Sequence, residues 1–218
     1  MFRNLIFDWS GTLVDDLGPV IEATNVVLGK YDVPPFDRES FRRHFRLPYR
    51  EFYHEFLPDV PLEELEAHFR TAFDAALTPV TVLPHVREKL AWCAVSGIRT
   101  FVLTAMDSTA FGRQIVRLGL RDFFEATYSG VLDKREVIHR ILATHGLDPA
   151  ATALVGDMIH DVETARHGGI SSIAVLTGYN HPEILAAVRP DFTVADLGAL
   201  RSMLDNAVQR HRAPLAIP

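Results

Sequence analysis

Apolar and polar positions alternate with two different periods, and these periods divide the chain into two parts. Residues 5–7 form a short apolar run that predicts a buried strand. From residue 17 to residue 76 the apolar positions recur with a helical period, in segments separated by prolines. We therefore predict about four helices there, at residues 17–30, 38–45, 49–56 and 62–76.

The pattern changes after residues 78–84, a linker that contains two prolines. Strand-like and helical segments then alternate, with predicted strands at 98–103, 126–128, 152–155, 172–176 and 192–194 and helices at 86–95, 109–118, 135–145, 162–167 and 182–188. Such alternation is typical of βαβ units in a parallel sheet covered on both faces. Because the first strand needs partners in this sheet, we predict an α/β fold with a discontinuous core, residues 1–15 and 84–218, and an inserted all-helical cap domain, residues 16–83.

Composition excludes several classes of partner. The net charge of −6 over 218 residues argues against nucleic acid, because phosphate backbones are held by clustered Lys and Arg. No apolar run approaches the roughly 18 residues of a membrane span, and the N-terminus leads directly into a strand, so we expect a cytoplasmic protein with no membrane partner. The single cysteine, Cys93, lies in an apolar helical pattern and is predicted to pack rather than react.

Polar residues follow the ends of several predicted strands. Asp8 comes directly after the first strand, and Thr104, Lys134 and Asp157 follow three later ones. The carboxyl ends of parallel strands share one edge of the sheet, where open α/β folds bind their ligands. We therefore expect these side chains to converge there.

Asp161 lies four residues after Asp157, so one turn of helix places both carboxylates toward the same cavity. Carboxylates beside a lysine indicate Mg²⁺, which prefers oxygen ligands, facing a phosphate. Taken singly, each residue has a structural explanation: Thr104 as a helix cap, Lys134 as a solvated charge, Asp161 as a first-turn acid. Their joint occurrence in this order favours a site.

In this order the residues resemble the motifs of the haloacid dehalogenase-like hydrolases, specifically the phosphoglycolate phosphatase-like subgroup with a helical cap. The resemblance covers nearly the whole chain, through residues 7–13, 103–104, 134 and 155–161. It implies a Rossmann-like core, a helical cap and hydrolysis of a phosphate ester.

The resemblance also implies a role for each residue. Asp8 attacks phosphorus to give an aspartyl-phosphate, while Thr104 and Lys134 hold the phosphoryl oxygens. Asp157 helps to hold Mg²⁺ and is oriented by Asp161. The remaining predicted contacts are the Mg²⁺ ligands Asp8 and Ser10, the latter through its main-chain carbonyl, and the substrate-binding residues Gly11, Thr12, Arg46 and Ala105.

Arg46 belongs to a cationic segment, residues 41–50, of an otherwise acidic chain. Because guanidinium groups pair well with carboxylates, this segment is predicted to bind an anionic tail of the substrate. The alternative is that its arginines only solvate a helix face.

Ser10 departs from the family pattern. Related phosphatases usually carry a second Asp there, which protonates the leaving alcohol and later activates water. A serine hydroxyl titrates too high for that role, so the roughly 10²–10⁴-fold contribution of general acid–base catalysis is expected to be missing. Ser10 is thus a candidate catalytic position with altered chemistry.

Two other enzyme classes also lack the second Asp at this position. Haloacid dehalogenases use no metal and depart from the pattern of residues 156–161, which is intact here. Phosphonoacetaldehyde hydrolases have a motif similar to residues 8–12 but need a cap lysine to form an imine, and neither Lys30, Lys89 nor Lys134 fits that role.

We therefore predict a Mg²⁺-dependent phosphatase for a small phosphorylated metabolite, as a monomer or homodimer. Two alternatives stay open. One is a phosphonoacetaldehyde hydrolase-like enzyme that cleaves a carbon–phosphorus bond without the imine lysine, on a substrate that supplies a stabilised leaving group. The other is a catalytically impaired phosphometabolite-binding protein.

Overall fold

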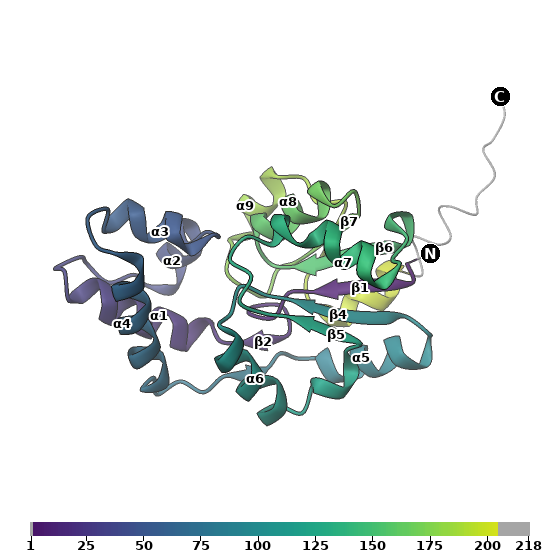
Figure 1. The fold of residues 1–218 in the computed structure, drawn as a ribbon, viewed down its shortest axis with the longest axis horizontal. Helices are drawn as coiled ribbons and strands as arrows, with labels where there is room; N and C mark the ends of the chain where they lie inside the picture. Colours follow the sequence, from purple (N-terminus) through teal and green to yellow (C-terminus); the bar gives the residue numbers. More distant parts are fainter. Residues whose placement is uncertain (1, 205–218) are drawn as a thin grey trace.

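A computed structural model describes residues 2–204 of the chain, and its centre is a six-stranded parallel sheet (Figure 1). The strand order is β5-β4-β1-β6-β7-β8, and every neighbouring pair is parallel. The strands are β1 (Asn4–Phe7), β4 (Arg99–Leu103), β5 (Ala126–Tyr128), β6 (Thr152–Gly156), β7 (Ser171–Val175) and β8 (Phe192–Val194). The predicted α/β fold is confirmed.

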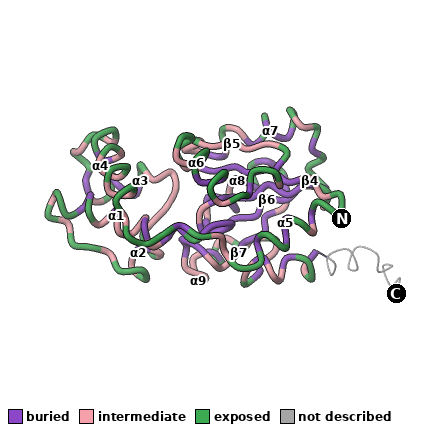
Figure 2. Tube along the Cα trace, turned by 90° about the horizontal axis from the view of Figure 1, so that it is seen from below, coloured by how far each residue is buried: buried purple, intermediate pink, exposed green. Residues whose placement is uncertain are grey.

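Helices cover both faces of this sheet because its strands are apolar on both sides. Along β1, Leu5 and Phe7 pack into one hydrophobic cluster and Ile6 packs into the other, as the two-residue period of a strand requires. Figure 2 shows the buried strands lying beneath exposed helical surfaces. The covering helices are α5 (Val86–Val95), α6 (Ser108–Arg117), α7 (Ile138–His145), α8 (Ile159–His167) and α9 (Pro182–Ala187).

Four further helices form a separate group beyond the carboxyl ends of the strands, which we call the helical lobe (Figure 1). They are α1 (Leu17–Gly29), α2 (Arg38–His44), α3 (Tyr49–Phe56) and α4 (Leu62–Asp74). The lobe has its own aromatic core around Phe41 and Phe52, which Met158 and Tyr179 of the sheet-bearing part join. As a division into domains, the boundaries after residues 15 and 83 stay a prediction.

A short antiparallel ribbon connects the two parts. Strand β2 (Val14–Asp15) leads into the lobe, and β3 (Thr81–Val82) leads out of it and pairs with β2. Two-residue strands are too short to show a period, so the sequence pattern gave no sign of them.

Two helices begin three residues away from their predicted starts, and in both cases a side chain sets the start. The Asp133 carboxylate accepts a hydrogen bond from the Arg135 amide, which produces a separate 3-10 turn at Lys134–Glu136 ahead of α7. The Asp161 carboxylate accepts one from the Met158 amide at 3.1 Å, so α8 begins at Ile159 rather than at residue 162. Both turns belong to the predicted site.

No helix among residues 2–204 combines the length and the apolar character needed to cross a bilayer.

Candidate active site

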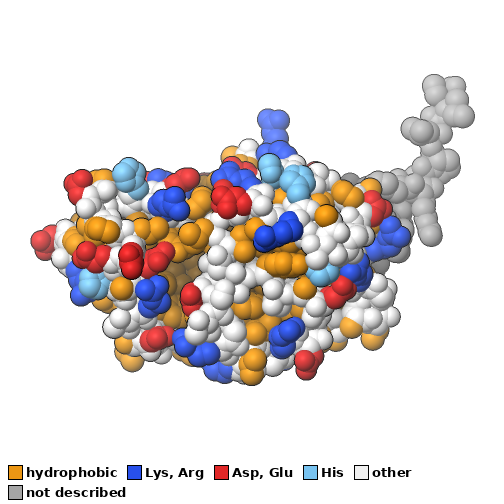
Figure 3. Space-filling view, viewed as in Figure 1, with side chains coloured by type: hydrophobic (Ala, Val, Ile, Leu, Met, Phe, Trp, Pro, Cys, Tyr) orange, Lys and Arg blue, Asp and Glu red, His pale blue; other side chains and the backbone are white. Residues whose placement is uncertain are grey.

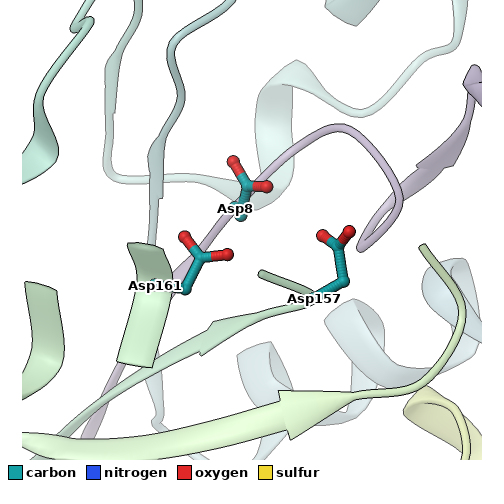
Figure 4. A group of neighbouring side chains, drawn as sticks. All are labelled: Asp8, Asp157 and Asp161. Atoms are coloured by element: carbon teal, nitrogen blue, oxygen red, sulfur yellow. The ribbon is translucent and has the colours of Figure 1, made fainter. Parts of the chain in front are cut away.

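Three buried carboxylates meet where β1 and β6 end. Asp8 follows β1, Asp157 follows β6, and Asp161 lies in the first turn of α8. One oxygen atom from each lies within 4.8 Å of the others (Figure 4). The predicted convergence of strand ends therefore places these groups where a single cation can contact all three.

Lys134 is the cation that the structure places among them. Its Nζ donates to Oδ1 of Asp8 and to Oδ1 of Asp161, each at 2.7 Å, and its side chain is fully buried. Burial alone lowers the pKa of Lys134, but attraction to Asp161 and Asp8 outweighs this and raises it, so the ammonium is charged at neutral pH.

One lysine does not neutralise three carboxylates. Burial raises the pKa of Asp8 to about 6 against the opposing attraction of Lys134. The pKa of Asp157 is raised well above its usual value by burial and then by repulsion from Asp8 and Asp161. The cluster therefore holds more negative charge than its own residues compensate.

A side-chain hydroxyl, a main-chain amide and two closely packed glycines fix the position of Asp157. Its Oδ1 accepts from the Thr12 hydroxyl at 2.7 Å and its Oδ2 from the Tyr179 amide at 2.6 Å. A Cβ on Gly11 would lie 2.5 Å from Asp157 Oδ2, and one on Gly178 would lie 2.0 Å from it. Gly11 also has φ +72°, which favours glycine. Gly11 and Thr12, predicted as substrate contacts, thus support the carboxylate.

A cavity of about 400 Å³ lies between the helical lobe and the sheet, and Asp8 is on its wall. Figure 3 shows a hollow between the two parts with hydrophobic side chains along it. Of the predicted site residues, Asp8, Ser10, Thr104 and Ala105 line this cavity. Lys134, Asp157 and Asp161 do not line it but lie close to Asp8.

A comparison with known sequence families agrees with this arrangement of site residues. A sequence model described as "Haloacid dehalogenase-like hydrolase" matches residues 5–175, which is most of the chain. The chain belongs to the haloacid dehalogenase-like hydrolases. The predicted family and its phosphoglycolate phosphatase-like subgroup are confirmed, and the protein is a hydrolase.

Curated relatives of this hydrolase span nearly its whole length. A phosphoglycolate phosphatase of Synechococcus elongatus is 28% identical over 193 residues, 87% of this chain and 91% of its own. A 5'-nucleotidase of Pseudomonas aeruginosa is 27% identical, with 94% of this chain and 96% of its own covered. The crystal structure of a predicted phosphatase from Clostridium acetobutylicum has a TM-score of 0.83 at 20% identity, covering 94% of this chain and 99% of its own, and so shares the fold.

Ser10 of this hydrolase is bonded to a carboxylate that the sequence analysis missed. Its Oγ donates to Oδ2 of Asp16 at 2.6 Å, and the Tyr179 hydroxyl donates to Oδ1 of Asp16 at 2.9 Å. Asp16 is only 2% exposed, yet it lines the same cavity as Asp8. Burial raises the pKa of Asp16 to about 7, although both hydroxyls oppose that rise.

The sequence does place Asp16 directly before a helix, but an aspartate there is usually explained as a helix cap. Asp16 is the second of two consecutive aspartates directly before a helix, which is the usual place for an N-cap. Only the fold shows that its carboxylate makes no capping bond.

His160 is a second residue that the sequence analysis did not identify. Its Nε2 accepts from the Lys134 amide at 3.1 Å, which fixes the turn that carries the lysine. Burial and then repulsion from Lys134 lower the pKa of His160 to about 4, so the ring is neutral and able to accept.

Arg46 is not among the residues that line the cavity. Its guanidinium lies 2.5 Å from Glu55 and 3.9 Å from Glu51, both on α3. Binding of an anionic tail by Arg46 therefore stays a prediction that this arrangement does not favour.

Proposed function

We propose that this hydrolase is a Mg²⁺-dependent phosphatase that works through an aspartyl-phosphate on Asp8. The observation that carries the proposal is the position of Asp8, which lines the cavity, accepts a hydrogen bond from Lys134 and lies beside Asp157 and Asp161. A carboxylate held next to an ammonium and a cation site is suited to approach a phosphate without repulsion. The phosphatase names of several relatives agree with this activity.

The donor set fits Mg²⁺. Asp8, Asp157 and Asp161 offer only oxygen atoms, and their charge exceeds that of Lys134. These carboxylates, with the main-chain carbonyl of Ser10, would hold the ion. When bound, the ion supplies positive charge that offsets the charge of the phosphoryl oxygens.

Each remaining residue then has a defined task. An oxygen of Asp8 bonds to phosphorus as the bond to the leaving oxygen breaks. Lys134 keeps Asp8 ionised and oriented, and it attracts the transferred phosphoryl group. Thr104 is 2% exposed and lines the cavity, so its hydroxyl is available to a phosphoryl oxygen there.

The cavity lining favours a phosphate ester with an apolar or aromatic organic group. Most of the lining between Asp8 and the lobe is hydrocarbon or aromatic ring, from Val20, Phe45, Leu47, Tyr49, Phe69, Phe73, Met106 and Leu132. The two arginines of the lining are each paired with an acidic residue of the lining: Arg70 lies 3.8 Å from Glu66, and Arg113 lies 3.9 Å from Asp74. The Tyr49 hydroxyl also donates to Glu66, at 2.6 Å. Small-molecule sites commonly combine such an apolar wall with a few polar groups.

The imine route of phosphonoacetaldehyde hydrolases, as distinct from carbon–phosphorus cleavage without an imine, needs a lysine that can react with the substrate. None of the residues that line the cavity is a lysine. Lys134 is bonded to two carboxylates and Lys89 is buried in α5, so neither is available for that reaction. The lining thus supports phosphate ester hydrolysis over the imine route.

Phosphate release over many turnovers tests the proposal and separates it from a binding protein. p-Nitrophenyl phosphate and benzyl phosphate should each yield inorganic phosphate with Mg²⁺, and a chelator should stop the release. Asp8→Asn should lose activity by at least about 10²-fold, while its melting temperature shows that it is folded. Full activity in Asp8→Asn would disprove the covalent mechanism, and binding without turnover in the wild type would indicate a phosphometabolite-binding protein.

A further inference from the structure

We propose that Asp16, acting through the hydroxyl of Ser10, supplies the proton transfers that a second motif aspartate performs in related phosphatases. This inference rests on the proposed function, because it assigns a residue to both halves of an aspartyl-phosphate cycle. Three observations about Asp16 support it: the missing helix cap, the missing ion pair and the hydrogen bond to Ser10.

The first observation is that Asp16 occupies an N-cap position without capping its helix. It directly precedes α1, and its side chain makes no hydrogen bond to the amides of the first turn. Aspartate is favoured at this position because that bond stabilises the helix. The carboxylate turns instead toward Ser10 and Tyr179.

The second observation is that this buried carboxylate has no cationic partner. Among residues 2–204 no Lys, Arg or His forms an ion pair with Asp16, and its two side-chain partners are neutral hydroxyls. Neither an ion pair with another residue nor a helix cap therefore accounts for the position of this carboxylate. Its neighbour Asp15, by contrast, is exposed on β2.

The third observation is the path that connects Asp16 with the reacting atoms. Asp8, Ser10 and Asp16 line the same cavity, and Ser10 lies two residues after Asp8. Ser10 Oγ donates to Asp16 at 2.6 Å and keeps its lone pairs free to accept a proton from a group beside Asp8. The Tyr179 hydroxyl holds the other Asp16 oxygen at 2.9 Å and so orients the carboxylate.

The resulting cycle balances. The cycle starts with Asp16 protonated and donating to Ser10 Oγ. In the first half, an Asp8 oxygen bonds to phosphorus and the bond from phosphorus to the alcohol oxygen breaks. The alcohol oxygen takes the Ser10 proton while Asp16 passes its own proton to Ser10, which leaves Asp16 as the carboxylate that accepts from Ser10 at 2.6 Å. In the second half, water bonds to phosphorus and the Asp8–phosphorus bond breaks. The water proton passes to Ser10 and the Ser10 proton passes to Asp16, which restores the starting state and yields alcohol and inorganic phosphate.

The test compares two aromatic esters that differ in leaving group. p-Nitrophenol departs with little need for a proton, whereas benzyl alcohol needs one. Asp16→Asn should form the aspartyl-phosphate from p-nitrophenyl phosphate but hydrolyse it slowly. It should therefore release one equivalent of nitrophenol in a burst, followed by steady turnover about 10²-fold below the wild type. On benzyl phosphate it should show no burst and a loss of similar or greater size.

Three further variants keep the test decisive. Ser10→Ala should reproduce the pattern of Asp16→Asn, which guards against a folding defect in the aspartate variant. Asp15→Asn removes the adjacent, exposed carboxylate and should match the wild type on both esters. In the exchanged variant, Ser10→Asp with Asp16→Ser, turnover of benzyl phosphate at least tenfold above that of Asp16→Ser alone would support the proposal.

Two outcomes would overturn it. A folded Asp16→Asn within threefold of the wild type on benzyl phosphate would show that another group carries the proton. Equal losses on both esters without a burst would show that Asp16 only supports the structure. If the wild type itself releases no phosphate from either ester, the proposed function fails and this inference fails with it.

Discussion

Lys134 Nζ lies 2.7 Å from Oδ1 of Asp8 and 2.7 Å from Oδ1 of Asp161, and none of the lysine side chain is exposed. The lysine therefore has a structural task beside its proposed catalytic one. Removing one partner of a buried ion pair leaves an uncompensated charge, which commonly costs about 3–5 kcal/mol.

We expect Lys134→Ala to lower the free energy of unfolding by roughly that amount in chelator, as measured by urea denaturation. Lys30→Ala, at an exposed position, should change it by less than about 0.5 kcal/mol and serves as the control. An unchanged urea midpoint in Lys134→Ala would show that Asp8 and Asp161 do not depend on the lysine.

Mg²⁺ should raise the melting temperature, because it would reduce the repulsion among the three buried carboxylates. An ion that binds only the folded state adds about 2.7 kcal/mol when its concentration is 100 times its Kd. Asp157→Asn removes one ligand and should reduce or abolish this rise. A wild type whose melting temperature is the same with Mg²⁺ and with chelator would contradict the proposed metal site.

Gly178→Ala should disturb the metal site without touching any ionisable group. The added Cβ would lie 2.0 Å from Asp157 Oδ2, so the carboxylate has to move. We expect the Mg²⁺-dependent rise in melting temperature to shrink and turnover to fall by at least about tenfold, since small displacements of catalytic groups are costly.

Gly112→Ala is the matched control for that variant. Gly112 lies within α6, and among residues 2–204 no atom other than those of its chain neighbours and its own helix backbone is within 4 Å of the position its Cβ would take. Alanine there should stabilise the protein by about 0.5–1 kcal/mol and leave turnover unchanged. Equal behaviour of the two alanine variants would contradict the close contact at Gly178.

Phe69 and Arg46 provide a test of what the cavity accepts. Phe69 lines the cavity, whereas Arg46 is paired with Glu55 on α3. Phe69→Ala should raise KM for benzyl phosphate about tenfold, while Arg46→Ala should change it less than twofold. A larger rise in KM for Arg46→Ala than for Phe69→Ala, together with a preference for phosphoglycolate over benzyl phosphate, would support the anionic tail predicted from the sequence. That result would contradict an apolar organic group in the substrate.

Cys93 should be inert in the folded protein. The thiol is buried in α5, and burial raises its pKa to about 11, so little thiolate exists at pH 8. A thiol reagent such as dithionitrobenzoate should label it slowly in buffer and rapidly in urea. Rapid labelling of the native protein would show that α5 opens readily or packs differently.

Local pattern was sufficient to predict most of the fold. The apolar strand at residues 5–7 and the later alternation of strands and helices predicted a parallel sheet, and the structure contains one in which β1 lies between β4 and β6. The reason is that parallel strands buried on both faces are apolar throughout, so they stand out from amphipathic helices. The ribbon of β2 and β3 was missed because two residues carry no period.

The position of Asp8, Lys134 and Asp157 could also be anticipated, since parallel strands bring their carboxyl ends to one edge whatever their side chains. The sequence alone showed that Ser10 lacks a carboxylate. It did not show that another carboxylate lies 2.6 Å from that hydroxyl. That contact needs the chain to turn back after Gly11, through the short bridge between Ser10 and Val14.

The partners of Asp16 and Arg46 were decided only by tertiary structure. An aspartate before a helix and an arginine in a cationic loop look the same in sequence whether they face solvent, a helix end or a substrate. The buried Asp16 accepts a hydrogen bond from the hydroxyl of Tyr179, far along the chain, and Arg46 is paired with Glu55 on the next helix. Such choices depend on which distant side chain supplies the hydrogen bond or the counter-charge, and no spacing along the sequence encodes that.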